Sequence, residues 1–190
     1  EMLRSLVGSE MCIRDSANGF EEVEALATVD VLRRADLNVK IVGVGSDVIT
    51  GAHGISTVCD ATDGDLTPGE DIEAVILPGG MPGTLNLERS DKVNAFIDYA
   101  FENGKLLCAI CAAPSILGHK GMLKGKKAVC FPGFESELEG AELSDSFVVS
   151  HGNIITAKGM GSAVKFGLAI ASVFVGKAKA KKIEESLQCS

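Results

Sequence analysis

The sequence predicts an α/β fold in which a mainly parallel sheet is covered by helices on both faces. From Gly19 onward, short apolar runs alternate with stretches of helical length and spacing, which is the pattern of repeated strand–helix units. Several apolar runs are cut off by glycine or proline, as in Leu77-Pro78-Gly79-Gly80, and such residues mark the turns between elements. In folds of this kind ligands bind at the carboxyl ends of the strands.

The first half of the chain supports this prediction element by element. Val23, Leu26 and Val31 recur at helical spacing, so a helix is expected over 21–35. Apolar runs predict strands over 39–44, 55–59 and 74–77, with 55–59 at an edge of the sheet. A further helix is expected over 87–102, because Asn103-Gly104 is a good C-terminal cap.

The second half continues the alternation. Strands are expected over 106–110, 127–131, 146–150 and 154–157, the last two joined by the turn residues His151-Gly152-Asn153. One helix is expected to begin after Cys111, with Pro114 in its first turn. A second apolar helix is expected to run from a Ser162 cap to Val175.

The first sixteen residues do not fit the pattern. A parallel-sheet protein should open with a strand buried on both faces, but only short, partly apolar stretches precede Arg14-Asp15-Ser16. We therefore expect residues 1–16 to be a non-native or disordered segment and residues 17–190 to form a single domain. If residues 10–16 fill the place of the first strand, Arg14 and Asp15 would bring charges among apolar neighbours and lower stability.

Charge and composition narrow the possible partners. The net charge of −8 argues against a specific nucleic-acid surface, and no apolar run reaches the roughly 18 residues of a membrane span. The basic cluster 177–182 alternates with alanine and is best explained by a solvated helix. Six scattered cysteines without a disulfide framework indicate reduced thiols and a cytoplasmic location.

Cys111 is the cysteine that the sequence singles out. It ends the apolar strand and precedes a helix start, where backbone N–H groups and the helix dipole favour a reactive thiolate. A buried, unreactive cysteine at a strand end is the competing interpretation, and the sequence alone leaves both open. A redox pair with Cys108 is disfavoured, because a separation of three along a strand turns the two side chains to opposite faces.

Three segments together resemble a known family. They are Ala17-Asn18-Gly19-Phe20-Glu21-Glu22-Val23-Glu24-Ala25, Leu77-Pro78-Gly79-Gly80-Met81-Pro82-Gly83 and Ala109-Ile110-Cys111-Ala112-Ala113-Pro114. Their order and spacing closely resemble the ThiJ/PfpI superfamily, in the branch of the Parkinsonism-associated deglycase, over about residues 17–185. The resemblance implies a flavodoxin-like three-layer sandwich, similar to class I glutamine amidotransferases.

The resemblance also implies roles for particular residues. It places the catalytic nucleophile at Cys111 and a general acid/base at Glu24, which would keep its proton and donate a hydrogen bond to the thiolate. Without the resemblance, Glu24 would be interpreted as a surface acid near a helix start. By resemblance, Gly80 and Ala112 form the oxyanion hole. Possible pocket residues are Gly79, His53 and Phe131. No cofactor and no metal are implied.

The implied activity is cysteine-dependent chemistry on reactive carbonyls. The family suggests a glutathione-independent glyoxalase, a protein or nucleotide deglycase, or both, acting on small aldehydes or glycated substrates in carbonyl and oxidative stress. The alternative is a non-enzymatic redox sensor and chaperone that responds to peroxide through Cys111. Peptidase or amidase activity is disfavoured, since Ala112 stands where those relatives carry histidine. A homodimer is expected, with the helix over 21–35 as a candidate contact.

Overall fold

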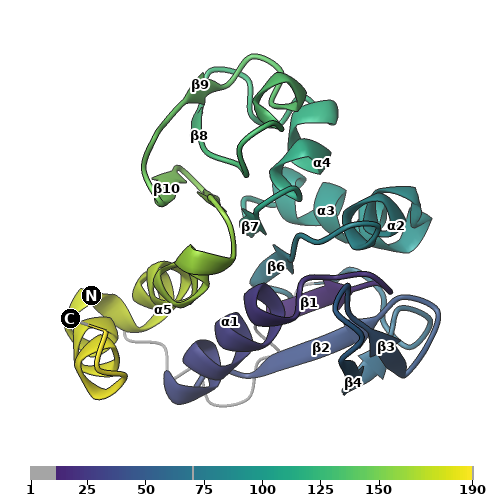
Figure 1. Ribbon diagram of the computed structural model, residues 1–190, viewed down its shortest axis with the longest axis horizontal. Coiled ribbons are helices and arrows are strands. Elements are labelled where there is room, and N and C mark those ends of the chain that lie inside the picture. Colours follow the sequence, from purple (N-terminus) through teal and green to yellow (C-terminus); the bar gives the residue numbers. More distant parts are fainter. Residues whose placement is uncertain (1–11, 70, 190) are drawn as a thin grey trace.

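The computed structural model is a three-layer α/β sandwich (Figure 1). It describes residues 12–69 and 71–189, with side chains from Ser16 onward. The central sheet has seven strands in the order β10-β11-β7-β6-β1-β2-β5. All neighbours are parallel except β10 and β11. This architecture confirms the predicted flavodoxin-like fold class.

The strands of the main sheet are β1 (Cys12–Ser16), β2 (Val39–Gly43), β5 (Ala61–Thr62), β6 (Ala74–Leu77), β7 (Leu106–Ile110), β10 (Val148–His151) and β11 (Ile154–Ala157). Two small sheets flank it. One pairs β3 (Val48–Thr50) with β4 (Ser56–Val58), and the other pairs β8 (Lys127–Ala128) with β9 (Glu142–Leu143). The helices are α1 (Glu22–Arg34), α2 (Gly83–Arg89), α3 (Asp91–Glu102), α4 (Pro114–His119) and α5 (Ala163–Ser186), with short 3-10 turns η1 (Glu135–Glu137) and η2 (Met160–Ser162).

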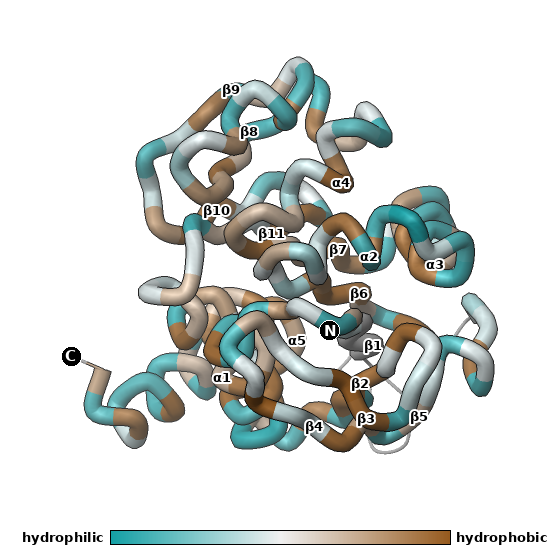
Figure 2. Tube along the Cα trace, turned by 45° about the vertical axis from the view of Figure 1, so that its right-hand side comes forward, coloured by the Kyte–Doolittle hydropathy of each residue, from teal (hydrophilic) through white to brown (hydrophobic). Residues whose placement is uncertain are grey.

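The apolar residues of the strands divide between two cores, one on each face of the sheet. Ile76, Cys108 and Ile110 pack in the cluster under α1 and α5, whereas Val75 and Leu107 pack in the cluster under α3 and α4. This alternation follows from the period of two along a strand. Every residue of β6 and β7 is accordingly buried, whereas α1 and α3 carry many hydrophilic residues (Figure 2).

Most predicted elements are present, and the differences have local causes. The helix expected over 87–102 is split at Ser90, whose extended backbone ends α2 and whose side chain caps α3 by accepting the Val93 N–H. The strand expected over 55–59 is β4, in a small hairpin sheet rather than at the edge of the main sheet. The strand expected over 127–131 is only two residues long. Ser162 does not cap α5 with its side chain, because its hydroxyl hydrogen-bonds to Gly159.

The first described strand, β1, occupies the middle of the sheet between β2 and β6. The domain boundary expected after residue 16 therefore falls at the end of a central strand. Residues 1–11 and the side chains of Arg14 and Asp15 lie outside the described residues, so the origin of residues 1–16 stays a prediction.

Helix α5 belongs to the core of the domain. Met160–Ser186 is long and apolar enough to cross a membrane by length and composition alone. However, Gly176 has a left-handed backbone that breaks the helix into two parts, and Phe166 and Ile170 are fully buried. Its contacts with α1 and the sheet are those of a core helix in a globular domain.

A histidine bridge ties the segment after α4 to the rest of the domain. The Nδ1 atom of His119 lies 2.5 Å from the Glu88 carboxylate of α2, and its Nε2 lies 2.8 Å from that of Glu137 in η1. The hydrogen bond with Glu88, and then that with Glu137, raises the pKa of His119. A protonated ring donates from both nitrogens, so the bridge is strongest when His119 is charged.

Candidate active site

Cys111 lies at the carboxyl end of β7, in a backbone conformation that is rare for a residue with a side chain. Its φ is +64°, in the left-handed region that costs roughly 1–2 kcal/mol for such a residue. The conformation is fixed by two hydrogen bonds, because its N–H donates to Ala157 O (2.9 Å) and its carbonyl accepts from the Phe131 N–H (2.8 Å). Strained nucleophiles of this kind cluster at functional sites.

This turn changes where the sulfur lies. The strand ends at Ile110, so the alternation along β7 does not continue to Cys111. Cys111 contacts the same apolar cluster as Cys108, and the expectation that the two cysteines face opposite sides was wrong. Helix α4 begins only at Pro114, so Cys111 does not lie directly at the helix start as expected.

Glu24 approaches Cys111 from the first turn of α1. Its side chain is almost fully buried, and its Oε2 atom accepts the N–H of Gly79 at 2.9 Å. The helix start is fixed by the neighbouring Glu21, whose carboxylate accepts the N–H of Glu24 at 2.7 Å. The structure thus directs Glu24 into the domain rather than leaving it at the surface.

Gly79 permits the close approach of the two groups. A Cβ atom at this position would lie 2.6 Å from the Cβ of Cys111 and 2.7 Å from Oε2 of Glu24. Both distances are too short for a real contact. The space between the catalytic candidates is therefore available only because residue 79 has no side chain.

The electrostatics of the pair differ from the expectation. The pKa of Cys111 is raised to about 12, first by burial, then by the charge of Glu24 and a hydrogen bond to it. Hydrogen bonds from the backbone N–H groups of Ala112 and Gly80 lower the pKa of Cys111, but by less than the other causes raise it. A charged Glu24 therefore disfavours the thiolate, and the expected thiolate beside a Glu24 that keeps its proton stays a prediction. Cys111 and Glu24 are in contact, so they titrate as a coupled pair. Transfer of the thiol proton to the Glu24 carboxylate leaves the negative charge on the sulfur.

The residues expected to form an oxyanion hole, Gly80 and Ala112, lie beside the Cys111 sulfur. The N–H groups of Gly80 and Ala112 both hydrogen-bond toward the Cys111 sulfur. Gly80 has φ +92°, and a Cβ there would lie 2.3 Å from the Glu21 nitrogen, so only glycine fits. Two N–H groups converging on a nucleophile can also bind an oxygen that develops negative charge beside it.

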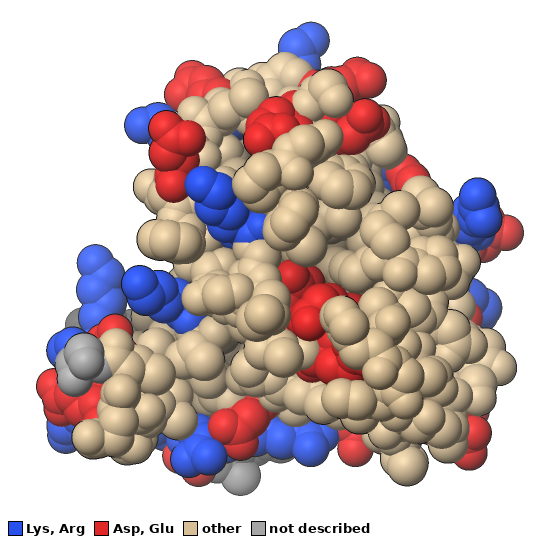
Figure 3. All heavy atoms as spheres, in the orientation of Figure 1, with Lys and Arg blue, Asp and Glu red and all other residues tan. Residues whose placement is uncertain are grey.

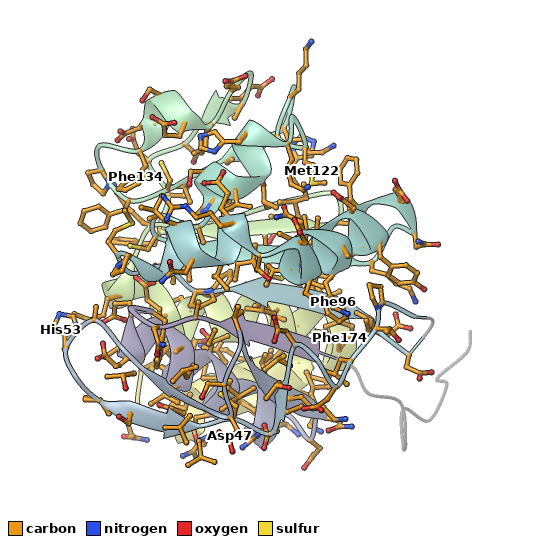
Figure 4. All side chains as sticks on the ribbon, turned by 90° about the vertical axis from the view of Figure 1, so that its right-hand side faces the viewer. Asp47, His53, Phe96, Met122, Phe134 and Phe174 are labelled. Atoms are coloured by element: carbon orange, nitrogen blue, oxygen red, sulfur yellow. The ribbon has the colours of Figure 1, made fainter. Side chains whose placement is uncertain are left out.

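The three expected pocket residues have different surroundings. Gly79 lies between Cys111 and Glu24, and Phe131 is adjacent through its hydrogen bond to the Cys111 carbonyl. His53 lies at the outer end of the loop between β3 and β4 (Figure 4), with 70% of its side chain exposed. Its Nδ1 atom is 2.8 Å from the buried carboxylate of Glu22, and this bond is the main cause that raises the pKa of His53.

One group of described residues has the composition of a metal site. Ligand atoms of Glu21, Glu22 and His53 lie within 4.8 Å of one another, and acidic atoms gather in a hollow beside the start of α1 (Figure 3). These atoms already have protein partners. Glu22 accepts the backbone N–H of His53 at 2.7 Å, and Glu21 accepts that of Glu24. The group therefore anchors the loop after β3 to α1.

Sequence reasoning assigned no role to several residues that surround the pair. Gly159 lies beside Glu24, and Phe147 and Met160 line a cavity next to it. Gly159 was visible as part of a Gly-x-Gly pattern. The other two are ordinary apolar residues in the sequence, and only the folded chain shows that they are exposed together.

The three-layer sandwich, with a strained cysteine beside a buried glutamate at the carboxyl edge of its sheet, defines an α/β protein with a candidate cysteine site. Comparison with known proteins gives its family. The DJ-1/PfpI family profile matches residues 15–173. The chain belongs to the DJ-1/PfpI family.

Individual relatives are similar over most of this chain. It is 32% identical over 184 residues to protein DJ-1 homolog B of Arabidopsis thaliana, covering 96% of this chain but 42% of that protein. It is 33% identical over 146 residues to deglycase PH1704 of Pyrococcus horikoshii, covering 75% and 86% respectively. The structure of oxidized Toxoplasma gondii DJ-1 superposes with a TM-score of 0.90 at 30% identity, over 95% of this chain and 98% of that one.

Proposed function

We propose that this protein is a cysteine-dependent enzyme that acts on small reactive carbonyls, as a glutathione-independent glyoxalase, a deglycase, or both. The observation that carries the proposal is the contact of half-buried Cys111 with buried Glu24, with the N–H groups of Gly80 and Ala112 aimed at the same sulfur. A nucleophile, a proton acceptor and two oxyanion donors are the parts that addition to a carbonyl requires.

The chemistry begins with addition of sulfur to the aldehyde carbon of a 2-oxoaldehyde. As the C–S bond forms, the thiol proton passes to Glu24, and the carbonyl oxygen takes the electron pair of its π bond. Gly80 and Ala112 hydrogen-bond to that oxygen. The raised pKa of Cys111 suits this order, because the base takes the proton during attack rather than beforehand.

The later steps need only proton transfers and water. Glu24 first returns the thiol proton to the oxygen and gives a hemithioacetal. The carboxylate then moves a proton from the former aldehyde carbon to the neighbouring carbon while the hydroxyl proton passes to the second carbonyl oxygen, which oxidises the first carbon and reduces the second. The product on Cys111 is a thioester of a 2-hydroxy acid. Water then cleaves the C–S bond, releasing the acid and restoring the thiol. The overall change adds one water and needs no external oxidant or reductant.

Deglycase activity would use the same nucleophile. An early glycation adduct on an amine or thiol carries a carbonyl carbon that Cys111 can attack. The relative from Pyrococcus horikoshii is named a deglycase, which supports this form of the activity. Protection against carbonyl and oxidative stress follows from either reaction.

The alternative is a peroxide sensor and chaperone that depends on oxidation of Cys111. Peroxide oxidises the thiolate, and the pKa of Cys111 is raised to about 12 beside a charged Glu24. The two functions differ in whether reduced Cys111 turns over a carbonyl substrate.

The first experiment measures loss of methylglyoxal and appearance of lactate with the wild-type chain, Cys111→Ser and Glu24→Gln. We expect both substitutions to abolish turnover while circular dichroism shows folded protein. Retained turnover in Cys111→Ser would refute the role of Cys111. Absence of turnover in folded wild-type protein, with selective oxidation of Cys111 by peroxide, would support the sensor instead.

We also propose that the protein is a cytoplasmic homodimer without specific nucleic-acid or membrane binding. Val23 and Leu26 expose 46% and 36% of their surface on the outer side of α1, as a helix at a subunit contact would. Among the described residues no two cysteines form a disulfide, which supports a reducing compartment.

A further inference from the structure

An apolar cavity of about 320 Å³ opens beside the candidate active site. Its walls come from three separate segments: Phe131 and Pro132 after β8, Phe147 before β10, and the turn 158–162 between β11 and α5. Phe131, Phe147 and Met160 each expose about half of their surface. Large apolar side chains exposed together around one cavity indicate a ligand site.

Two residues of the cavity wall, Phe131 and Gly159, lie next to the catalytic pair. Phe131 donates its backbone N–H to the Cys111 carbonyl. A Cβ placed on Gly159 would lie 3.1 Å from the Phe131 ring and 3.9 Å from Oε1 of Glu24. Gly159 therefore borders both the cavity and the proton acceptor, so a carbonyl compound held at Cys111 can extend its substituent past this glycine.

The cavity walls are held in place before any ligand binds. The N–H of Lys158 donates to Phe147 O at 2.9 Å, which fixes Phe147 to the end of β11. The Ser162 hydroxyl donates to Gly159 O at 2.7 Å and closes the turn that carries Met160. The ammonium group of Lys165 lies 5.2 Å from the centre of the Phe147 ring, within the range of a cation–π contact.

We propose that this cavity binds an aromatic or branched apolar substituent R of 2-oxoaldehydes R–CO–CHO. The proposal rests on the proposed carbonyl chemistry and specifies its substrate class. The methyl group of methylglyoxal is too small to cover the three exposed side chains, whereas a phenyl ring can lie against them and remove their apolar surface from water. Lys158 lines the cavity and Lys165 lies over the Phe147 ring. Their ammonium groups can attract the carboxylate of the 2-hydroxy acid product.

The test compares kcat/KM for phenylglyoxal and methylglyoxal in the wild-type chain, Phe147→Ala and Met160→Ala. Val173→Ala is the matched control, since Val173 is equally exposed at 57% but does not line this cavity. We expect the wild-type chain to prefer phenylglyoxal by about tenfold. Each cavity variant should remove most of that preference, and the control should keep it.

A second measurement reports occupancy of the cavity without turnover. Mandelate, the product from phenylglyoxal, should slow alkylation of Cys111 by iodoacetamide more than lactate does, and Met160→Ala should abolish the difference. Turnover of methylglyoxal without preference for phenylglyoxal would overturn this inference and leave the proposed function intact. Protection by mandelate without any turnover would support the cavity and refute the function. Absence of both turnover and protection by mandelate would overturn both the cavity inference and the proposed function.

Discussion

Substituting Gly79 with alanine tests the geometry of the site most directly. The new Cβ would lie 2.6 Å from the Cys111 Cβ, 2.7 Å from Glu24 Oε2 and 3.0 Å from Ile110 O. Ordinary contact begins near 3.4 Å, so Oε2 must move by about 0.7 Å and the cysteine by a similar amount. Glu24 is buried on α1, and the half-buried Cys111 is held by backbone hydrogen bonds to Ala157 and Phe131, so neither can move freely.

The consequences divide between stability and activity. Overpacking of a closed site costs about 1–3 kcal/mol, which lowers the Tm of a domain of this size by roughly 2–12 °C. Displacing a catalytic group by about 1 Å costs about 100-fold in turnover. We therefore expect Gly79→Ala to stay folded at 25 °C with a lower Tm and to lose about 100-fold in methylglyoxal turnover.

The control is Gly64→Ala, because the nearest heavy atom to a Cβ there lies at an ordinary 3.6 Å. Differential scanning fluorimetry and the lactate assay measure both variants under one set of conditions. If Gly79→Ala matched Gly64→Ala in Tm and in turnover, the close packing of Cys111 against Glu24 would be refuted.

Three further predictions concern charge and assembly. Glu24→Gln removes the charge that helps to raise the pKa of Cys111, so the midpoint of its alkylation by iodoacetamide should move to lower pH although turnover is lost. A midpoint at higher pH would mean that Glu24 holds the proton and donates it. The raised pKa of His119 stabilises the fold below about pH 6.5, and this stabilisation is lost as pH rises through the folded pKa. His119→Gln should therefore lower the Tm more at about pH 6 than at about pH 9, and an equal loss at both would refute a charged bridge. Val23→Asp should convert the proposed dimer to a monomer in light scattering, whereas an unchanged mass would exclude α1 as the contact.

Much of the fold could be predicted because its elements are encoded by local patterns. The strand over 74–77 is a short apolar run closed by Pro78, and the helix over 21–35 has apolar residues at helical spacing. Both were found within one residue of their observed bounds. The break at Ser90 was missed because an apolar helical pattern continues on both sides of it. Strand β3, the partner of β4 in the small hairpin, was also missed, since a strand of three residues carries almost no periodicity.

The proximity of Cys111 and Glu24 could be predicted from the sequence, but the electrostatics of the pair could not. Motif spacing brought Cys111 and Glu24 together through resemblance. The pKa of Cys111 could not be predicted, because it depends on burial and on a carboxylate that reaches the sulfur from another element. The left-handed backbone of Cys111 was equally hidden, since it is imposed by hydrogen bonds to Ala157 and Phe131 that form only in the folded chain.

The central place of β1 in the sheet has a consequence for folding. Its two neighbours, β2 and β6, lie later in the chain, beginning at Val39 and Ala74. During synthesis one edge of β1 therefore lacks its native partner β2 until the chain has been made through Gly43, and the other edge lacks β6 until Leu77. Unpaired strand edges associate with other chains. Slow elongation before Leu77 should increase aggregation of nascent chains, and pauses after Leu77 should increase it less.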